Sequence, residues 1–134
     1  MKVLIWIVSS LVALLFIAVG AMKLLTPAAE LSQMSAGVPV ALIQLAGLAE
    51  VLGGLGLILP AATRILPVLT PAAAVGLTVT MVGATIANAV TSVYSAIPMT
   101  VGLLVVCAAL AWARLTRYRV EPRAVESTRT PVAA

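Results

Sequence analysis

The sequence contains no histidine and a single cysteine, Cys107, and charged residues make up only 9% of its 134 positions. Without histidine the chain has lost the commonest metal ligand, and one cysteine cannot form an internal disulfide. We therefore predict no metal site, and metal or thiol redox chemistry within this chain alone is disfavoured.

The scarcity of charge also excludes the soluble classes. Hydrophobic residues make up 63% of the chain, against about 45 to 50% in soluble domains, and a small domain cannot hide so much apolar surface. Residues 3–22, 31–49 and 65–113 carry no charge at all. Uncharged apolar runs of about 18 residues or more are typical of membrane spans. The chain is predicted to be an integral membrane protein.

These runs predict an all-α four-helix bundle over residues 1–113, with spans at about 3–22, 40–59, 66–90 and 97–113. The run 65–113 has 49 residues, too many for one span of about 20. We divide it at the cluster of polar residues and proline that ends with Pro98. Pro39, Pro67 and Pro98 fall at predicted helix starts, where a missing N–H costs no intrahelical bond. The first run has 20 residues, longer than the about 7 to 15 of a signal peptide, so we expect it to remain as a span.

Basic residues concentrate at the C-terminus. Five of the eight lie in the last 21 positions, directly after a hydrophobic run: Arg114, Arg117, Arg119, Arg123 and Arg129. Such a juxtamembrane cluster indicates contact with anionic lipid rather than with nucleic acid. We predict that residues 114–134 form a basic, disordered tail on the cytoplasmic side.

Counting Lys and Arg on each side of the four spans predicts the orientation. Lys2, Arg64 and the five tail arginines fall on one side, and Lys23 falls alone on the other. Both termini are therefore expected in the cytoplasm, with the chain in a bacterial inner membrane. Arg64, Arg114, Arg117 and Arg119 are candidate topology anchors or partner contacts.

Glu50 is the most informative residue because it falls near the centre of the second span. A charge at the bilayer centre costs at least about 2.5 kcal/mol, so this side chain should face the bundle interior. Gly47 and Gly54 share its helical face and Gly53 adds another small position, which allows close approach of a neighbouring helix. Two readings stay open: a protonated glutamic acid that only hydrogen-bonds across helices, or a ligand- or proton-binding group.

Other polar residues are predicted to form two layers. Lys23 lies about 15 Å outward from the centre of the first helix, so a direct pair with Glu50 needs a tilted or shifted helix. Hydroxyls are better candidates at the level of Glu50, above all Thr78, with Thr80 and Ser10, and we expect Glu50 to be neutral at pH 7. Lys23, Gln44 and Asn88 form the outer layer, as candidate ligand contacts, although Lys23 could also be a snorkelling interfacial lysine.

Three motifs in order carry a resemblance to a known family. The first predicted helix closes with Gly20-Ala21-Met22-Lys23-Leu24, and the second contains Glu50-Val51-Leu52-Gly53-Gly54-Leu55-Gly56-Leu57. Arg64 then opens the third. This arrangement resembles the DoxX-like family of small four-helix bacterial membrane proteins. The resemblance implies recurrent polar positions at Lys23, Glu50 and Arg64. One departure is Asn88, where members often have a histidine, so a proton or redox role at that position has no support.

Two hypotheses for the function follow from these features. Family members are described as subunits of thiosulfate:quinone oxidoreductases or as membrane partners of redox enzymes in oxidative-stress complexes. The resemblance therefore implies a non-catalytic subunit or scaffold for a redox partner, binding a quinone-like or lipid ligand near Glu50, with no cofactor held within the chain and with homo-oligomers possible. The rival hypothesis is a small proton-coupled transporter that uses Glu50.

The distribution of basic residues gives a direct test of topology. A reporter that is active only in the periplasm, fused after Ala134, should stay inactive, because seven basic residues hold the terminal side in the cytoplasm. Periplasmic activity of the fusion would contradict the four-span orientation.

Overall fold

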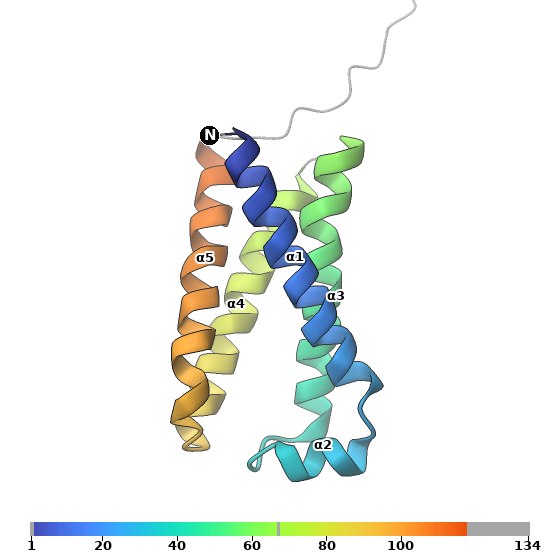
Figure 1. The fold of residues 1–134 in the computed structure, drawn as a ribbon, viewed down its shortest axis with the longest axis vertical. Helices are drawn as coiled ribbons and strands as arrows, with labels where there is room; N and C mark the ends of the chain where they lie inside the picture. Colours follow the sequence, from blue (N-terminus) through green and yellow to red (C-terminus); the bar gives the residue numbers. More distant parts are fainter. Residues whose placement is uncertain (1, 67, 118–134) are drawn as a thin grey trace, which may run out of the picture.

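A computed structural model describes residues 2–66 and 68–117, and every regular element in these residues is helical (Figure 1). In chain order the elements are α1 (Lys2–Leu25), α2 (Ala28–Met34), α3 (Val40–Thr63), α4 (Leu69–Val90), the short 3-10 helix η1 (Tyr94–Ala96) and α5 (Ile97–Thr116). The predictions for Pro67, Arg119 and the tail beyond residue 117 lie outside the described residues.

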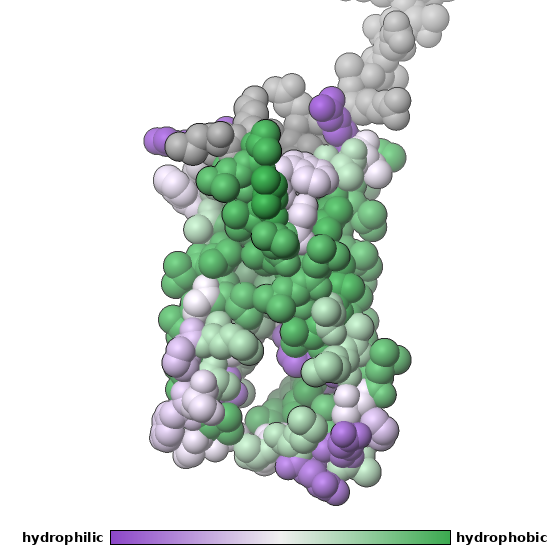
Figure 2. All heavy atoms as spheres, viewed as in Figure 1, coloured by the Kyte–Doolittle hydropathy of each residue, from purple (hydrophilic) through white to green (hydrophobic). Residues whose placement is uncertain are grey.

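Four segments of the described chain are long and apolar enough to cross a membrane: Val3–Leu25, Val40–Thr63, Leu69–Val90 and Tyr94–Thr116. Each has 22 to 24 residues, so each is about 33 to 36 Å long as a helix, enough for a hydrocarbon core of about 30 Å. Figure 2 shows the matching belt of hydrophobic side chains between more hydrophilic ends. The predicted class, an all-α membrane protein with four spans, is confirmed.

Three of the four long helices run a few residues further than the sequence predicted, whereas α4 begins at Leu69 rather than at residue 66. The clearest case is α3, which we expected to end at residue 59 but which continues through Pro60 to Thr63. Proline lacks an N–H and so removes one helical hydrogen bond, but in the last turn that loss does not stop the helix. Arg64 ends it instead, with a left-handed φ of 57° and its N–H donating to the Pro60 carbonyl at 2.9 Å.

Pro39 and Pro98 lie at helix starts as predicted, and one helix was not anticipated. Pro39 is the N-cap residue of α3, and Pro98 lies in the first turn of α5. The extra helix is α2, a two-turn segment that begins directly after Pro27 and buries only Leu31. It lies across the end of the bundle, outside the spans (Figure 1).

The spans pack as two helix pairs joined through α3 and α4. The main contacts are between α1 and α3, between α4 and α5, and between α3 and α4. All four spans contribute to one core, which includes Phe16, Leu57, Leu77, Cys107 and Leu110. Cys107 is therefore a packing residue in this structure.

The two ends of the bundle differ in charge and in how closely the helix pairs approach each other. The start of α1, the α3–α4 connection and the end of α5 lie together at one end, while α2 and η1 lie at the other (Figure 1). Arg64, Arg114 and Arg117 lie at the first end, which we call the basic end. Towards the α2 end the two helix pairs diverge, and Figure 2 shows a hollow there.

Glycines bring α1 and α3 into close contact. A Cβ on Gly20 would lie 2.5 Å from the carbonyl oxygen of Gly47, and a Cβ on Gly54 would lie 2.8 Å from the carbonyl oxygen of Ala13. Both neighbours are backbone atoms, which cannot move aside as a side chain can. Gly53 instead faces α4, where a Cβ would meet Leu77 at 2.6 Å. The glycine-rich stretch of α3 thus serves two neighbouring helices.

This contact predicts different costs for the same substitution at two glycines. Gly20→Ala should destabilise the bundle by about 1 to 3 kcal/mol, the usual cost of overpacking, because α1 must move away from α3. Gly102→Ala is the control, since a Cβ there meets nothing within 4 Å, and it should change stability by less than about 0.5 kcal/mol. Unfolding of both variants in mild detergent checks this, and equal stability would contradict it.

Candidate ligand site

Lys23 and Glu50 form an ion pair between α1 and α3. The Lys23 Nζ lies 2.6 Å from Glu50 Oε1 and donates a hydrogen bond to it. The Glu50 side chain is 2% exposed, whereas that of Lys23 is 29% exposed. Glu50 is therefore sealed between the helices, and Lys23 is the member of the pair that can meet another molecule.

We expected a direct Lys23–Glu50 pair only with a tilted or shifted helix, and the structure forms the pair. The two helices are staggered: a Cβ on Gly20 would lie 3.0 Å from the Cβ of Glu50, so Lys23, three residues further along α1, lies only about one turn outward from Glu50. Gly47 makes this possible because it precedes Glu50 by one turn on the same face, and a Cβ there would lie 2.9 Å from the Cβ of Lys23. With no side chain at position 47, the lysine stem can lie against α3.

The hydroxyls expected to serve Glu50 bond elsewhere. Thr78, Thr80 and Ser10 each donate to the carbonyl four residues earlier in their own helix, at 2.8 to 3.0 Å. This is the usual way for serine and threonine to satisfy a hydroxyl within an apolar helix. The predicted layer of Glu50 and hydroxyls is therefore not formed.

The ion pair also removes the argument for a neutral Glu50. That prediction assumed that no cation lies within reach, yet the ammonium of Lys23 contacts Oε1 directly. The second oxygen, Oε2, is buried and has no hydrogen-bond partner among the described residues. Glu50 thus keeps one acceptor position free while the other holds Lys23 in place.

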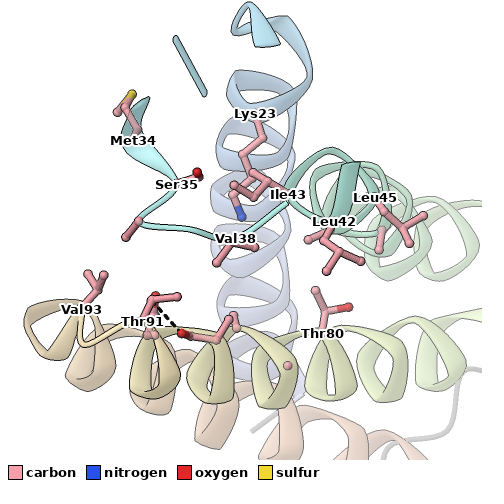
Figure 3. Close-up of a pocket in the computed structure, with 17 residues that line it drawn as sticks. Lys23, Met34, Ser35, Val38, Leu42, Ile43, Leu45, Thr80, Thr91 and Val93 are labelled. Atoms are coloured by element: carbon pink, nitrogen blue, oxygen red, sulfur yellow. Dashed lines mark hydrogen bonds between the residues drawn. The ribbon is translucent and has the colours of Figure 1, made fainter. Parts of the chain in front are cut away.

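Lys23 forms part of the wall of a cavity at the α2 end of the bundle. The cavity has a volume of about 560 Å³ and lies between α3, α4 and the segment that follows α2. Figure 3 shows Lys23 reaching from α1 toward it, with Val38 and Ile43 on one side and, on the other, Thr80 of α4 and Thr91 directly after that helix. Most of the other lining residues are apolar, so the polar groups are few and localised.

Asn88 also lines this cavity, on α4. It is half-buried, and its side chain makes no hydrogen bond within residues 2–66 and 68–117. Lys23 has three N–H donors, of which one goes to Glu50. Lys23 and Asn88 therefore offer spare hydrogen-bonding groups to the same cavity, whereas the other candidates, Gln44 and Thr78, are half-buried but do not line it.

The basic end contains a buried arginine that sequence reasoning missed. We expected Arg114 to face anionic lipid, but it is 6% exposed and its Nη2 donates to Ser9 Oγ of α1 at 3.2 Å. Arg117 and Arg64 are exposed, as expected of residues at a membrane surface. The contact of Arg114 with Ser9 joins the first span to the last at the end where the bundle is closed.

The model of the DoxX-like family matches residues 7–110. The chain belongs to the DoxX-like family. Searches among curated proteins and among solved structures found no match. The matched range extends into all four spans and includes Lys23, Glu50 and the residues that line the cavity, and it confirms the resemblance drawn from the sequence.

The ion pair predicts an asymmetric pattern of stabilities. Lys23→Met leaves the sealed carboxylate without its partner and should cost up to about 3 to 5 kcal/mol. Glu50→Gln should cost less, about 1 to 3 kcal/mol, because the lysine that it leaves unpaired is partly exposed and can turn to water.

The double variant Lys23→Met/Glu50→Gln serves as the control, because it removes both charges and keeps both shapes. It should be more stable than Lys23→Met alone, since no buried charge is then left unpaired. Unfolding of the four proteins in detergent completes the cycle. Additive losses in the double variant would show that the two side chains do not interact.

Proposed function

We propose that this DoxX-like protein is a non-catalytic membrane subunit that binds a quinone-like molecule in the cavity beside Lys23. The observation that carries the proposal is the position of Lys23, which is fixed by Glu50 and borders an otherwise mostly apolar cavity. Ligand sites of this kind combine apolar walls with a few placed polar groups. The volume of about 560 Å³ lies within the range of about 300 to 1,000 Å³ common for small-molecule sites.

The charge of the site favours a neutral head group. Lys23 carries a positive charge, but Glu50 compensates it at 2.6 Å, so an anionic ligand would meet no net attraction. A quinone carbonyl is neutral and accepts hydrogen bonds, which suits the free N–H groups of Lys23 and the amide of Asn88. The apolar walls suit the ring.

A redox partner would supply the electron chemistry. The chain has no histidine and one cysteine, and that cysteine lies in the core, so we assign to this protein the binding of the ligand rather than its reduction or oxidation. We propose that the partner docks at the basic end, where Arg64 and Arg117 are exposed. In this proposal the protein resides in a bacterial inner membrane with both termini in the cytoplasm.

One observation favours the rival function, proton-coupled transport. Glu50 Oε2 is buried and without a partner in the described chain, so it could accept a proton. The ion pair works against this function, because protonation of Glu50 would leave the Lys23 charge unpaired. Proton uptake by liposomes that contain the wild-type protein, lost in Glu50→Gln, would favour the transporter.

Binding of a tailless dimethoxy-methyl-benzoquinone to the protein in nanodiscs tests the proposal. Asn88→Leu should weaken binding roughly threefold to tenfold, the factor for one hydrogen bond of about 1 kcal/mol. The double variant Lys23→Met/Glu50→Gln should weaken it further, because the cavity then has no cationic donor.

Gln44→Leu is the matched control, since it makes the same amide-to-leucine change on a residue that does not line the cavity. Its affinity for the quinone should equal that of the wild type. Equal affinities in Asn88→Leu, Gln44→Leu and the wild type would contradict binding at this site.

A further inference from the structure

A second hollow, of about 370 Å³, continues the cavity between α3 and α4 toward the basic end. We call it the α3–α4 groove. Its walls include Gly53 and Gly56 of α3 and Ala72 and Gly76 of α4. The groove and the cavity share two residues, Ala49 and Thr80. The two hollows therefore adjoin, and a long molecule in the cavity could extend along the groove.

The groove offers no polar group to an occupant. Its lining residues are alanine, glycine and leucine, apart from Thr80. The hydroxyl of Thr80 donates to the Gly76 carbonyl at 3.0 Å, so the junction with the cavity presents no unpaired donor. Apolar spaces of this kind take up apolar molecules rather than water. The lining of the groove thus suits the hydrocarbon part of a ligand, whereas the cavity beside it offers polar groups to a head group.

Two glycines form the floor of the groove and a third borders it. Gly53 and Gly56 pack against Leu77 and Ala73, where an added Cβ would lie 2.6 to 2.8 Å away, but a Cβ on Gly76 would meet nothing within 4 Å. From Thr80 to Leu69, both of which line the groove, α4 rises about 16 Å. The groove is therefore long and open along α4, and a large side chain at position 76 would take up part of its space.

Its shape suits a hydrocarbon chain better than a helix. α3 and α4 are already in contact where Gly53 meets Leu77 and Gly56 meets Ala73, so the space between them is too narrow for a further helix about 10 Å wide. A helix from a second copy could only rest on the rim, whereas a single chain could lie within it.

We propose that the ligand of the cavity carries a long alkyl or isoprenoid tail, and that this tail lies in the α3–α4 groove. The inference rests on the proposed function for its head group, which binds beside Lys23. The head then lies at the α2 end, and the tail runs along α4 toward the basic end. The protein would thus select an amphipathic membrane quinone rather than a small soluble one.

A benzoquinone with a decyl tail that ends in a photoreactive diazirine tests this placement. After illumination in nanodiscs, mass spectrometry should find the label within residues 49–56 and 69–80. Gly76→Leu should lose most of this labelling, because the new side chain takes up part of the groove. Gly102→Leu is the matched control, since its position is equally open and lines neither hollow, and its labelling should equal that of the wild type.

Tailless benzoquinone, measured on the same variants, separates the two proposals. Unchanged binding of the tailless quinone to Gly76→Leu, together with loss of tail labelling, supports the tail groove. Labelling that Gly76→Leu leaves intact, or that spreads over the outer face of α5, overturns the groove while the head site stands. Failure of the tailless quinone to bind the wild type, with the groove still labelled by the tail, overturns the head site and supports the groove as a hydrocarbon site.

A second copy in the groove is a separate outcome. In a Cys107→Ala background, Ala72→Cys should remain monomeric under oxidising conditions, since the groove is expected to hold a tail. Disulfide-linked dimers that form in step with loss of tail labelling would overturn the proposal.

Discussion

The close contact of α1 with α3 is the constraint on which the site depends. Gly20 and Gly47 remove the side chains that would separate the two helices, and the space they leave lets Lys23 reach Glu50. A carboxylate near the middle of a span is costly unless it is paired. The glycines and the ion pair therefore depend on each other: the close approach of the helices lets the pair form, and the pair compensates the carboxylate that this approach buries.

The same contact explains why the cavity lies where it does. Because α1 and α3 are held together along their length, and Arg114 joins α5 to α1 through Ser9 at the basic end, the two helix pairs can diverge only toward α2. The cavity occupies that divergence, with Lys23 from one pair and Asn88 from the other on its walls. A ligand that contacts both residues would bridge the two pairs.

The sequence predicted the features that depend on composition and periodicity. It did not predict the level at which two long side chains, Lys23 and Arg114, meet their partners on another helix. Four spans, the shared face of Gly47, Glu50 and Gly54, and the family all followed from patterns within single helices. The Lys23–Glu50 pair was not anticipated because depth was counted from the centre of each span separately, whereas the structure packs Gly20, near the end of α1, against Glu50 at the middle of α3. Arg114 was expected to point outward, because a basic residue at the end of a span usually reaches toward the membrane surface. Nothing in the sequence near Arg114 indicates that Ser9 of α1 lies within hydrogen-bonding distance.

The ion pair does more than compensate a buried charge. The glycine contacts already disfavour a shift of α1 along α3, because one turn would bring Phe16 or Leu24 to the place of Gly20, where even a Cβ would lie 2.5 Å from the Gly47 carbonyl oxygen, and the ion pair adds an electrostatic cost. Lys23 meets Glu50 in one register only, since a shift by a turn of about 5.4 Å would separate the charges and leave Glu50 unpaired in an apolar interface. The two costs together fix the register, and with it the position of Lys23 at the edge of the cavity. The polar group that a ligand would meet is thus placed by a residue that the ligand never touches.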